Sequence, residues 1–227
     1  MPKLLEVIVT SLDEAVEAEI GGADRLELVR SLDEGGFTPS PDDVRRVVEA
    51  VAIPVRVMLR ENATMSAGGR AEIETLIGHA RTFSRLAVDG LVLGFVRNGS
   101  LDSECMREIL AAAPNCRATF HLAFEHTNDP LRAIEELKRF PQIDRILTRG
   151  GEGPWKERKA RLLEWQRAAA PEIRVLVGIG LRTSNFAELK QEPSLQEVHA
   201  GRAVRVPPST SGRVDRTRIA ALKSALL

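Results

Sequence analysis

The chain of 227 residues contains little cysteine and few aromatic side chains: two Cys, two Trp, seven Phe and no Tyr. Cys105 and Cys116 make neither a disulfide framework nor the closely spaced pair of a structural zinc site. This scarcity is typical of proteins in a reducing cytosol. The 32 Lys and Arg residues balance 32 Asp and Glu residues, so the basic excess of a nucleic-acid-binding protein is also missing.

Long apolar runs are absent as well. No stretch approaches the roughly 18 consecutive apolar residues of a membrane-spanning helix, and acidic residues interrupt the N-terminal segment before a signal-peptide core can form. We therefore expect a cytoplasmic protein with neither a membrane nor a nucleic-acid partner. The chain also has no P-loop, no GxGxxG after its first apolar segment and no Ser-His-Asp order, which excludes the common NTPase, dinucleotide-binding and serine-hydrolase patterns.

What the chain does contain is an alternation of short apolar, β-branched segments with longer amphipathic ones. The segments predicted to be strands span residues 4–10, 25–29, 54–60, 90–95, 117–123, 144–148, 173–180 and 195–201. Eight repeats of about 28 residues predict a single compact (β/α)8 TIM barrel, forming one domain over residues 1–227. An open doubly wound sheet is the alternative, but it rarely needs eight strands in so short a chain.

Helix start signals separate the predicted strands. Ser11 followed by Glu14 is typical of a capping box, and Ser40 and Asp129 each precede a proline at a first helical position. Thr183 or Ser184 is expected to cap a helix near the C-terminal end of the barrel. These signals agree with a helix after each strand.

Polar side chains stand at the ends of several predicted strands, where barrels of this type build their active sites. Strand alternation places Arg56, Met58 and Arg60 on one inward face, and Glu197 and His199 on another. We interpret five of these polar residues as candidate catalytic groups: Glu6, Glu27, Arg60, His121 and His199. The alternative is a structural ion-pair network, in which Glu6, Glu27 or Glu197 neutralises Arg56 or Arg60.

Glycine-rich turns follow the last three predicted strands, at 147–153, 177–185 and 199–204. Backbone amides in such turns can bind an anion, and Arg149, Arg182 and Arg202 lie beside the glycines. The candidate anion-binding residues are Thr148, Gly150, Gly178, Gly180, Gly201 and Arg202. The alternative is that the glycines serve only tight turns.

A metal site is the third interpretation. His121, His126 and His199 are candidate ligands because two or three imidazoles can meet at the barrel mouth. Soft ligands for copper(I) at this end are limited to Met65 and the deeper Met58. Cys105 in a predicted helix and Cys116 at the opposite end of the barrel are expected to be packing residues.

Several segments resemble the CutC family, which is named for copper homeostasis. They are LLEVIVTS, GGADRLELVRSLDEGGFTPS, IPVRVMLREN, DGLVLGFVRNGSLD, ATFHLAFEHTNDP, DRILTRGG and LQEVHAG, and together they span about residue 4 to residue 203. The resemblance implies a TIM barrel, a cytoplasmic homo-oligomer such as a dimer, and copper binding or trafficking. It implies no established reaction. The residues that match the family pattern at the mouth are Glu6, Glu27, Arg60, His121 and His199.

The departures from the family pattern bear on copper. Ile8, Val9 and Val29 occupy positions where family members often have cysteines, which argues against thiolate binding of copper(I). The motif His-Arg-Ala-Phe-Asp becomes His-Leu-Ala-Phe-Glu at residues 121–125. Two main hypotheses remain: a copper homeostasis protein that binds the metal ion, and an enzyme acting on a small phosphorylated or anionic metabolite by general acid/base chemistry. A third alternative is a barrel whose main role is assembly with a partner.

Overall fold

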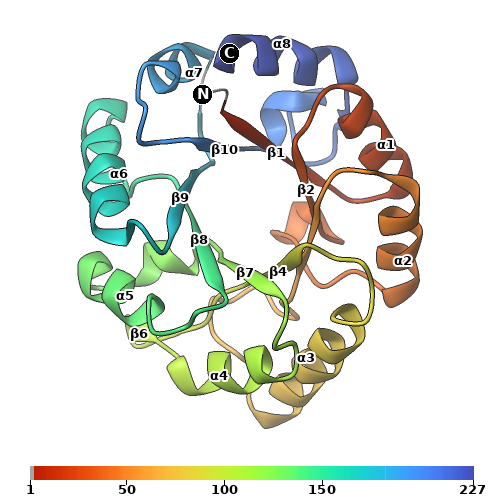
Figure 1. Cartoon of the computed structure of the whole chain (residues 1–227), viewed down its shortest axis with the longest axis vertical. Coiled ribbons are helices and arrows are strands. Elements are labelled where there is room, and N and C mark those ends of the chain that lie inside the picture. The colour runs from red at the N-terminus through yellow and green to blue at the C-terminus, as the bar shows by residue number, and fades with distance from the viewer. Residues whose placement is uncertain (1–2, 182) are drawn as a thin grey trace.

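The computed structural model describes residues 3–181 and 183–227, with the side chain of Thr183 excepted. Each βα repeat places one strand in a central sheet: β1 (Leu4–Val9), β2 (Arg25–Leu28), β3 (Val55–Met58), β4 (Gly90–Leu93), β7 (Arg117–Phe120), β8 (Ile143–Thr148), β9 (Arg174–Val177) and β10 (Glu197–Ala200). These strands are all parallel and close in the order β1–β10–β9–β8–β7–β4–β3–β2. The predicted barrel is confirmed (Figure 1).

Eight α-helices of the described chain surround the barrel (Figure 1). They are α1 (Leu12–Ile20), α2 (Pro41–Ala50), α3 (Arg70–Phe83), α4 (Ser103–Ala111), α5 (Pro130–Leu137), α6 (Trp155–Ala169), α7 (Thr183–Lys190) and α8 (Arg216–Leu226). None of these helices is long and apolar enough to cross a membrane.

Most helices begin where the sequence predicts. The side chains of Ser11, Ser40 and Asp129 accept hydrogen bonds from backbone amides in the first turns of α1, α2 and α5. Such bonds satisfy amides that have no partner inside the helix. At α7 the prediction differs, because Thr183 and Ser184 lie inside the helix, and Arg182 before it is outside the described residues.

Two hairpins lie outside the barrel sheet. β5 (Val96–Arg97) pairs with β6 (Ser100–Leu101), and β11 (Arg205–Val206) pairs with β12 (Arg213–Val214). The sequence predicts only a loop after the last barrel strand. The turn of the second hairpin brings Pro208 and Thr210 to the barrel mouth.

Side chains on the two faces of the strands have different surroundings. The outward-facing set, such as Leu5, Val7 and Val9 of β1, packs against the helices in the main hydrophobic core. Inside the barrel, one apolar set consists of Ile8, Val29, Met58 and Val92, with Leu32 against them. Charged side chains also point into the interior, where they must find partners.

An ion-pair network lies inside the barrel, near the N-terminal ends of the strands. Arg25, which is 2% exposed, donates to Glu6 at 2.5 Å and to Glu197 at 2.8 Å. Arg145 also donates to Glu197, at 2.6 Å. Arg56 donates to Asp89 at 2.8 Å and to Asp144 at 2.7 Å. A structural network therefore exists and includes Arg56, but its pairings differ from those expected. Glu6 and Glu197 pair with Arg25, and Arg56 pairs with Asp89 and Asp144.

Candidate functional site

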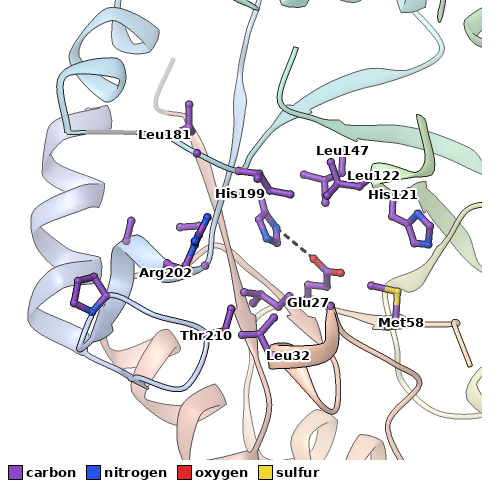
Figure 2. A pocket seen from close by; sticks show the side chains of 18 of the residues that line it. Glu27, Leu32, Met58, His121, Leu122, Leu147, Leu181, His199, Arg202 and Thr210 are labelled. Atoms are coloured by element: carbon purple, nitrogen blue, oxygen red, sulfur yellow. Dashed lines mark ion pairs between the residues drawn. The ribbon is translucent and has the colours of Figure 1, made fainter. Parts of the chain in front are cut away.

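A cavity of about 640 Å³ opens at the C-terminal ends of the barrel strands (Figure 2). Seven of the predicted site residues line it: Glu27, Arg60, His121, Gly180, His199, Gly201 and Arg202. Its remaining walls are largely apolar, with Ile8, Leu32, Met58 and Leu147 among them. Loop residues such as Leu32 and Thr210 were not predicted, because no local pattern shows which loops fold over the mouth.

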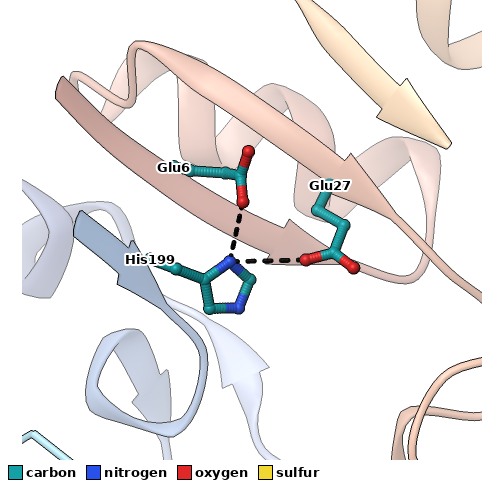
Figure 3. Close-up of side chains that lie close together, drawn as sticks. All are labelled: Glu6, Glu27 and His199. Carbon is teal, nitrogen blue, oxygen red and sulfur yellow. Dashed lines mark hydrogen bonds and ion pairs between the residues drawn. The ribbon is translucent and has the colours of Figure 1, made fainter. Parts of the chain in front are cut away.

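A buried imidazole lies between two buried carboxylates at the base of this cavity (Figure 3). His199 Nδ1 is 2.8 Å from Glu6 Oε1 and 3.3 Å from Glu27 Oε2. Strand pairing creates the cluster, since β1 lies between β2 and β10 and Glu6 is in register with His199. Figure 3 shows the second ring nitrogen of His199 pointing away from both carboxylates.

These three buried groups shift one another's pKa values. Burial alone lowers the pKa of His199, but its hydrogen bond to Glu6 and the charge of Glu27 outweigh burial and raise that pKa. For Glu6, the positive charge of Arg25 and the bond to His199 overcome burial, so its pKa is lowered. Burial raises the pKa of Glu27 to about 7, although the charge of His199 opposes this. The cluster thus combines a carboxyl with a lowered pKa, an imidazole with a raised pKa and a second carboxyl that titrates near neutral pH.

His121, directly after β7, has a defined tautomer. Its Nδ1 accepts a hydrogen bond from the backbone amide of Ala123 at 3.1 Å, so the proton of the neutral ring lies on Nε2. Burial, and secondly the charge of Arg60, lower the pKa of His121 to about 3, so the ring is neutral. Nε2 is buried and has no hydrogen-bond partner among the described residues.

The three predicted histidine ligands do not form one metal site. Within the described chain, the one group of three ligand atoms lying within 4.8 Å of one another comes from Glu6, Glu27 and His199. His126 is exposed on the loop after β7. His121 offers a protonated Nε2 because its Nδ1 is already engaged. The cluster at the mouth therefore consists of one imidazole and two carboxylates, whereas the sequence predicted a cluster of imidazoles.

Arg60 is fixed by the backbone of the loops around it. Its guanidinium donates to the carbonyls of Gly35 at 3.0 Å, Asn62 at 2.9 Å and Ala63 at 2.7 Å. Three of its five N–H groups are thus engaged within the protein. Its charge borders the cavity, but its main hydrogen bonds hold the loops after β2 and β3 in place.

The glycine turn after β8 already contains an anion, which is the carboxylate of Glu125. Glu125 Oε1 accepts from the amides of Arg149 at 2.9 Å and Gly151 at 3.4 Å and from the hydroxyl of Thr148. The amide of Gly150 donates to Thr148 Oγ1 at 3.0 Å. The prediction that Thr148 and Gly150 bind an external anion is therefore wrong, because a side chain of the protein satisfies this turn.

The other two glycine turns differ from the first. The amide of Gly178 donates to the carbonyl of Thr148 at 3.0 Å, which extends the sheet and leaves Gly178 unable to bind a ligand through its amide. Gly180 and Gly201 line the cavity, and their amides donate to no other residue in the ranges 3–181 and 183–227. Arg202 lies beside them, whereas the predicted clamp residue Arg182 is outside the described residues.

Comparison with known proteins agrees with this architecture. Residues 3–204 match the model of the CutC family. The chain belongs to the CutC family. A CutC family protein from Mesorhizobium japonicum is 34% identical over 208 residues, which cover 91% of this chain and 80% of that protein. The copper homeostasis protein cutC homolog of Homo sapiens is also 34% identical, over 86% of this chain and 72% of the human protein.

Solved structures show the same relationship. The crystal structure of the CutC protein from Streptococcus agalactiae superposes with a TM-score of 0.79, at 25% identity, over 88% of this chain and 98% of that one. Phosphoribosyl anthranilate isomerase from Thermococcus kodakaraensis superposes with a TM-score of 0.61 at 16% identity, over 98% of each chain. The second likeness shows the barrel fold alone.

Proposed function

We propose that this CutC family member acts in copper homeostasis by binding a copper ion as cargo at the barrel mouth. The observation that supports the proposal is the convergence of Glu6, Glu27 and His199, whose ligand atoms lie within 4.8 Å of one another. Separations of 2.8 and 3.3 Å between His199 Nδ1 and the two carboxylate oxygens are compatible with ligands around one ion, since metal–ligand bonds are roughly 2.0–2.2 Å long. The family comparison favours copper handling over the enzymatic alternative.

The donor atoms favour divalent copper over copper(I). Copper(I) prefers thiolate and thioether ligands, whereas imidazole and carboxylate suit divalent ions, among which copper(II) generally binds most tightly. Ile8 and Val29 belong to the apolar set inside the barrel, so two positions where relatives often carry cysteine contribute only methyl groups here. Val9 faces the outer core and is not part of the mouth.

The cysteines of the chain do not change this preference. Cys105 lies in α4 and Cys116 just before β7, and both are buried and free. Burial, with the negative charge of Asp102 next in importance, raises the pKa of Cys105 to about 12. Burial also raises the pKa of Cys116. Neither thiol is in the form that binds metal near neutral pH.

Competition titrations test the proposal. The protein is titrated with copper(II) against a competing chelator, and anaerobically with copper(I) against a copper(I) indicator. We expect copper(II) to bind at one site per chain, with an affinity at least tenfold lower in His199→Gln, which removes a ligand of the cluster. The matched control is His126→Gln at an exposed histidine, which should bind like the wild type. Equal binding by His199→Gln, or tight binding of copper(I) alone, would overturn the proposal.

We also propose that the protein is a single-domain cytoplasmic homo-oligomer, a dimer in the simplest case. Two buried, unpaired thiols support a reducing compartment, and the CutC resemblance supports self-association. Light scattering coupled to size-exclusion chromatography measures the mass directly. A mass equal to one chain of 24.9 kDa at micromolar concentration contradicts the dimer.

A further inference from the structure

The mouth cavity is much larger than a metal ion requires. Its volume of about 640 Å³ falls within the roughly 300–1,000 Å³ typical of pockets that enclose small organic molecules. A single water molecule occupies about 30 Å³. Its walls are mainly apolar, as are those of organic ligand sites, and the cavity extends from His199 to the loops around Leu32 and Leu181 (Figure 2).

One wall of the cavity carries a buried donor that nothing in the described chain satisfies. His121 is 4% exposed, lines the cavity, and holds its Nε2–H without an acceptor. The opposite ring nitrogen is fixed by Ala123, and Gly94 packs so closely that a methyl there would lie 2.7 Å from Nδ1. Because buried donors are almost always paired, this fixed N–H is suited to an acceptor oxygen supplied by a ligand.

The far side of the mouth carries a second set of donors. Gly180 and Gly201 follow β9 and β10, line the cavity, and donate to no other described residue. Arg202 adds a positive charge beside them. In the closed sheet β9 and β10 are two and three strands away from β7, so Gly180 and Gly201 line a different side of the cavity from His121.

We propose that the cavity binds a small organic anion with an oxyanion at each end and a short apolar middle. One end accepts the hydrogen bond of His121 Nε2–H. The other end, a phosphate or a carboxylate, accepts from the amides of Gly180 and Gly201 beside Arg202. The apolar middle lies against side chains such as Leu122 and Leu147. The site does not depend on copper, because none of these donors belongs to the Glu6, Glu27 and His199 cluster.

Calorimetric titration of metal-free protein tests the site. The probes are phosphonoacetate, 3-phosphonopropionate and 4-phosphonobutyrate, which place a phosphonate and a carboxylate at increasing separation. Glutarate and inorganic phosphate are the companion probes, and they show whether the Gly180 end holds a carboxylate or a phosphate. We expect one two-ended probe to bind more tightly than inorganic phosphate.

Variants connect this binding to His121. His121→Phe keeps a ring but removes the donor, and we expect it to weaken the best probe by roughly tenfold or more, as for a lost hydrogen bond to a charged group. His126→Gln at the neighbouring exposed histidine is the matched control and should leave the affinity unchanged. Arg202→Leu should weaken binding less than His121→Phe does, because Arg202 is exposed.

A spectroscopic measurement on the unmodified protein covers the case in which His121→Phe does not fold. Long-range ¹H–¹⁵N spectra should show His121 as the Nε2–H tautomer, with a proton resonance that shifts when the best probe is added. Saturable binding together with this shift supports the proposal. It is overturned if no two-ended probe binds at millimolar concentration, if His121→Phe binds like the wild type, or if the His121 resonance is unchanged while a probe binds.

Discussion

Replacing Arg25 by leucine should destabilise the barrel strongly. The Arg25 guanidinium donates to Glu6 at 2.5 Å and to Glu197 at 2.8 Å, and its side chain is 2% exposed. Leucine fills part of the space but leaves two buried carboxylates with one partner fewer. Removal of one member of a buried ion pair costs about 3–5 kcal/mol in unfolding free energy, and we expect Arg25→Leu to fall in this range at pH 7.

The loss of stability in Arg25→Leu should also depend on pH. In the wild type, the charge of Arg25 helps to hold the pKa of Glu6 and of Glu197 below the ordinary value of 4.5, against the opposing effect of burial. A carboxyl with a lowered pKa in the folded state stabilises the protein above the unfolded pKa, and this contribution is lost as the pH falls. Without Arg25 both pKa values move upward. The difference in unfolding free energy between Arg25→Leu and the wild type should therefore be largest near neutral pH and should decrease towards pH 4.

Urea unfolding followed by circular dichroism at pH 7, 5.5 and 4.5 measures both effects. The matched control is Arg70→Leu on α3, where the side chain is 61% exposed and pairs with Glu74 and Glu108. Exposed pairs of this kind contribute about 0.2–1 kcal/mol. The reasoning is refuted if Arg25→Leu costs no more than the control, or if its cost is the same at every pH.

Four further predictions concern other parts of the fold. Gly150→Ala should cost at least about 1–3 kcal/mol of unfolding free energy, because φ is +88° and the new methyl would lie 2.6 Å from a carbonyl of α6. Gly78→Ala, mid-helix with nothing within 4 Å, should instead stabilise by about 0.5–1 kcal/mol. Glu125→Ala should speed amide hydrogen exchange across residues 149–151, and protection equal to wild type would contradict the role of this carboxylate. Cys105 and Cys116 should resist a thiol reagent at pH 8 in folded protein and react fully in denaturant, as measured by thiol titration.

Local sequence features predicted the barrel because each depends on neighbouring residues. Strand alternation placed Arg56 and Met58 inside, and both are buried there. The cap residues Ser11 and Ser40 act within three positions of themselves, so their role is visible in the sequence. The two short hairpins were missed, since segments of two residues carry no periodicity.

The candidate site was predicted only in part. Strand ends correctly led to Glu27, His121 and His199 at the mouth. The glycine turn after β8 was misread, because its anion is Glu125 from the preceding loop, and the sequence cannot show which carboxylate reaches which amide. The sequence also could not predict the unpaired Nε2–H of His121, since the tautomer of this ring follows from a backbone contact in the folded chain.

The sequence by itself determined the barrel and the inward faces of its strands. It also determined that the mouth offers oxygen and nitrogen ligands rather than thiols. Only the tertiary structure decided which charges are neutralised and which polar groups remain available. Arg25 and Glu197 are 172 positions apart, and closure of the barrel brings them to 2.8 Å. Burial makes such pairings important for stability. Closure of the barrel therefore engages Glu197 and the turn after β8 within the protein, and it leaves His121, Gly180 and Gly201 lining the cavity.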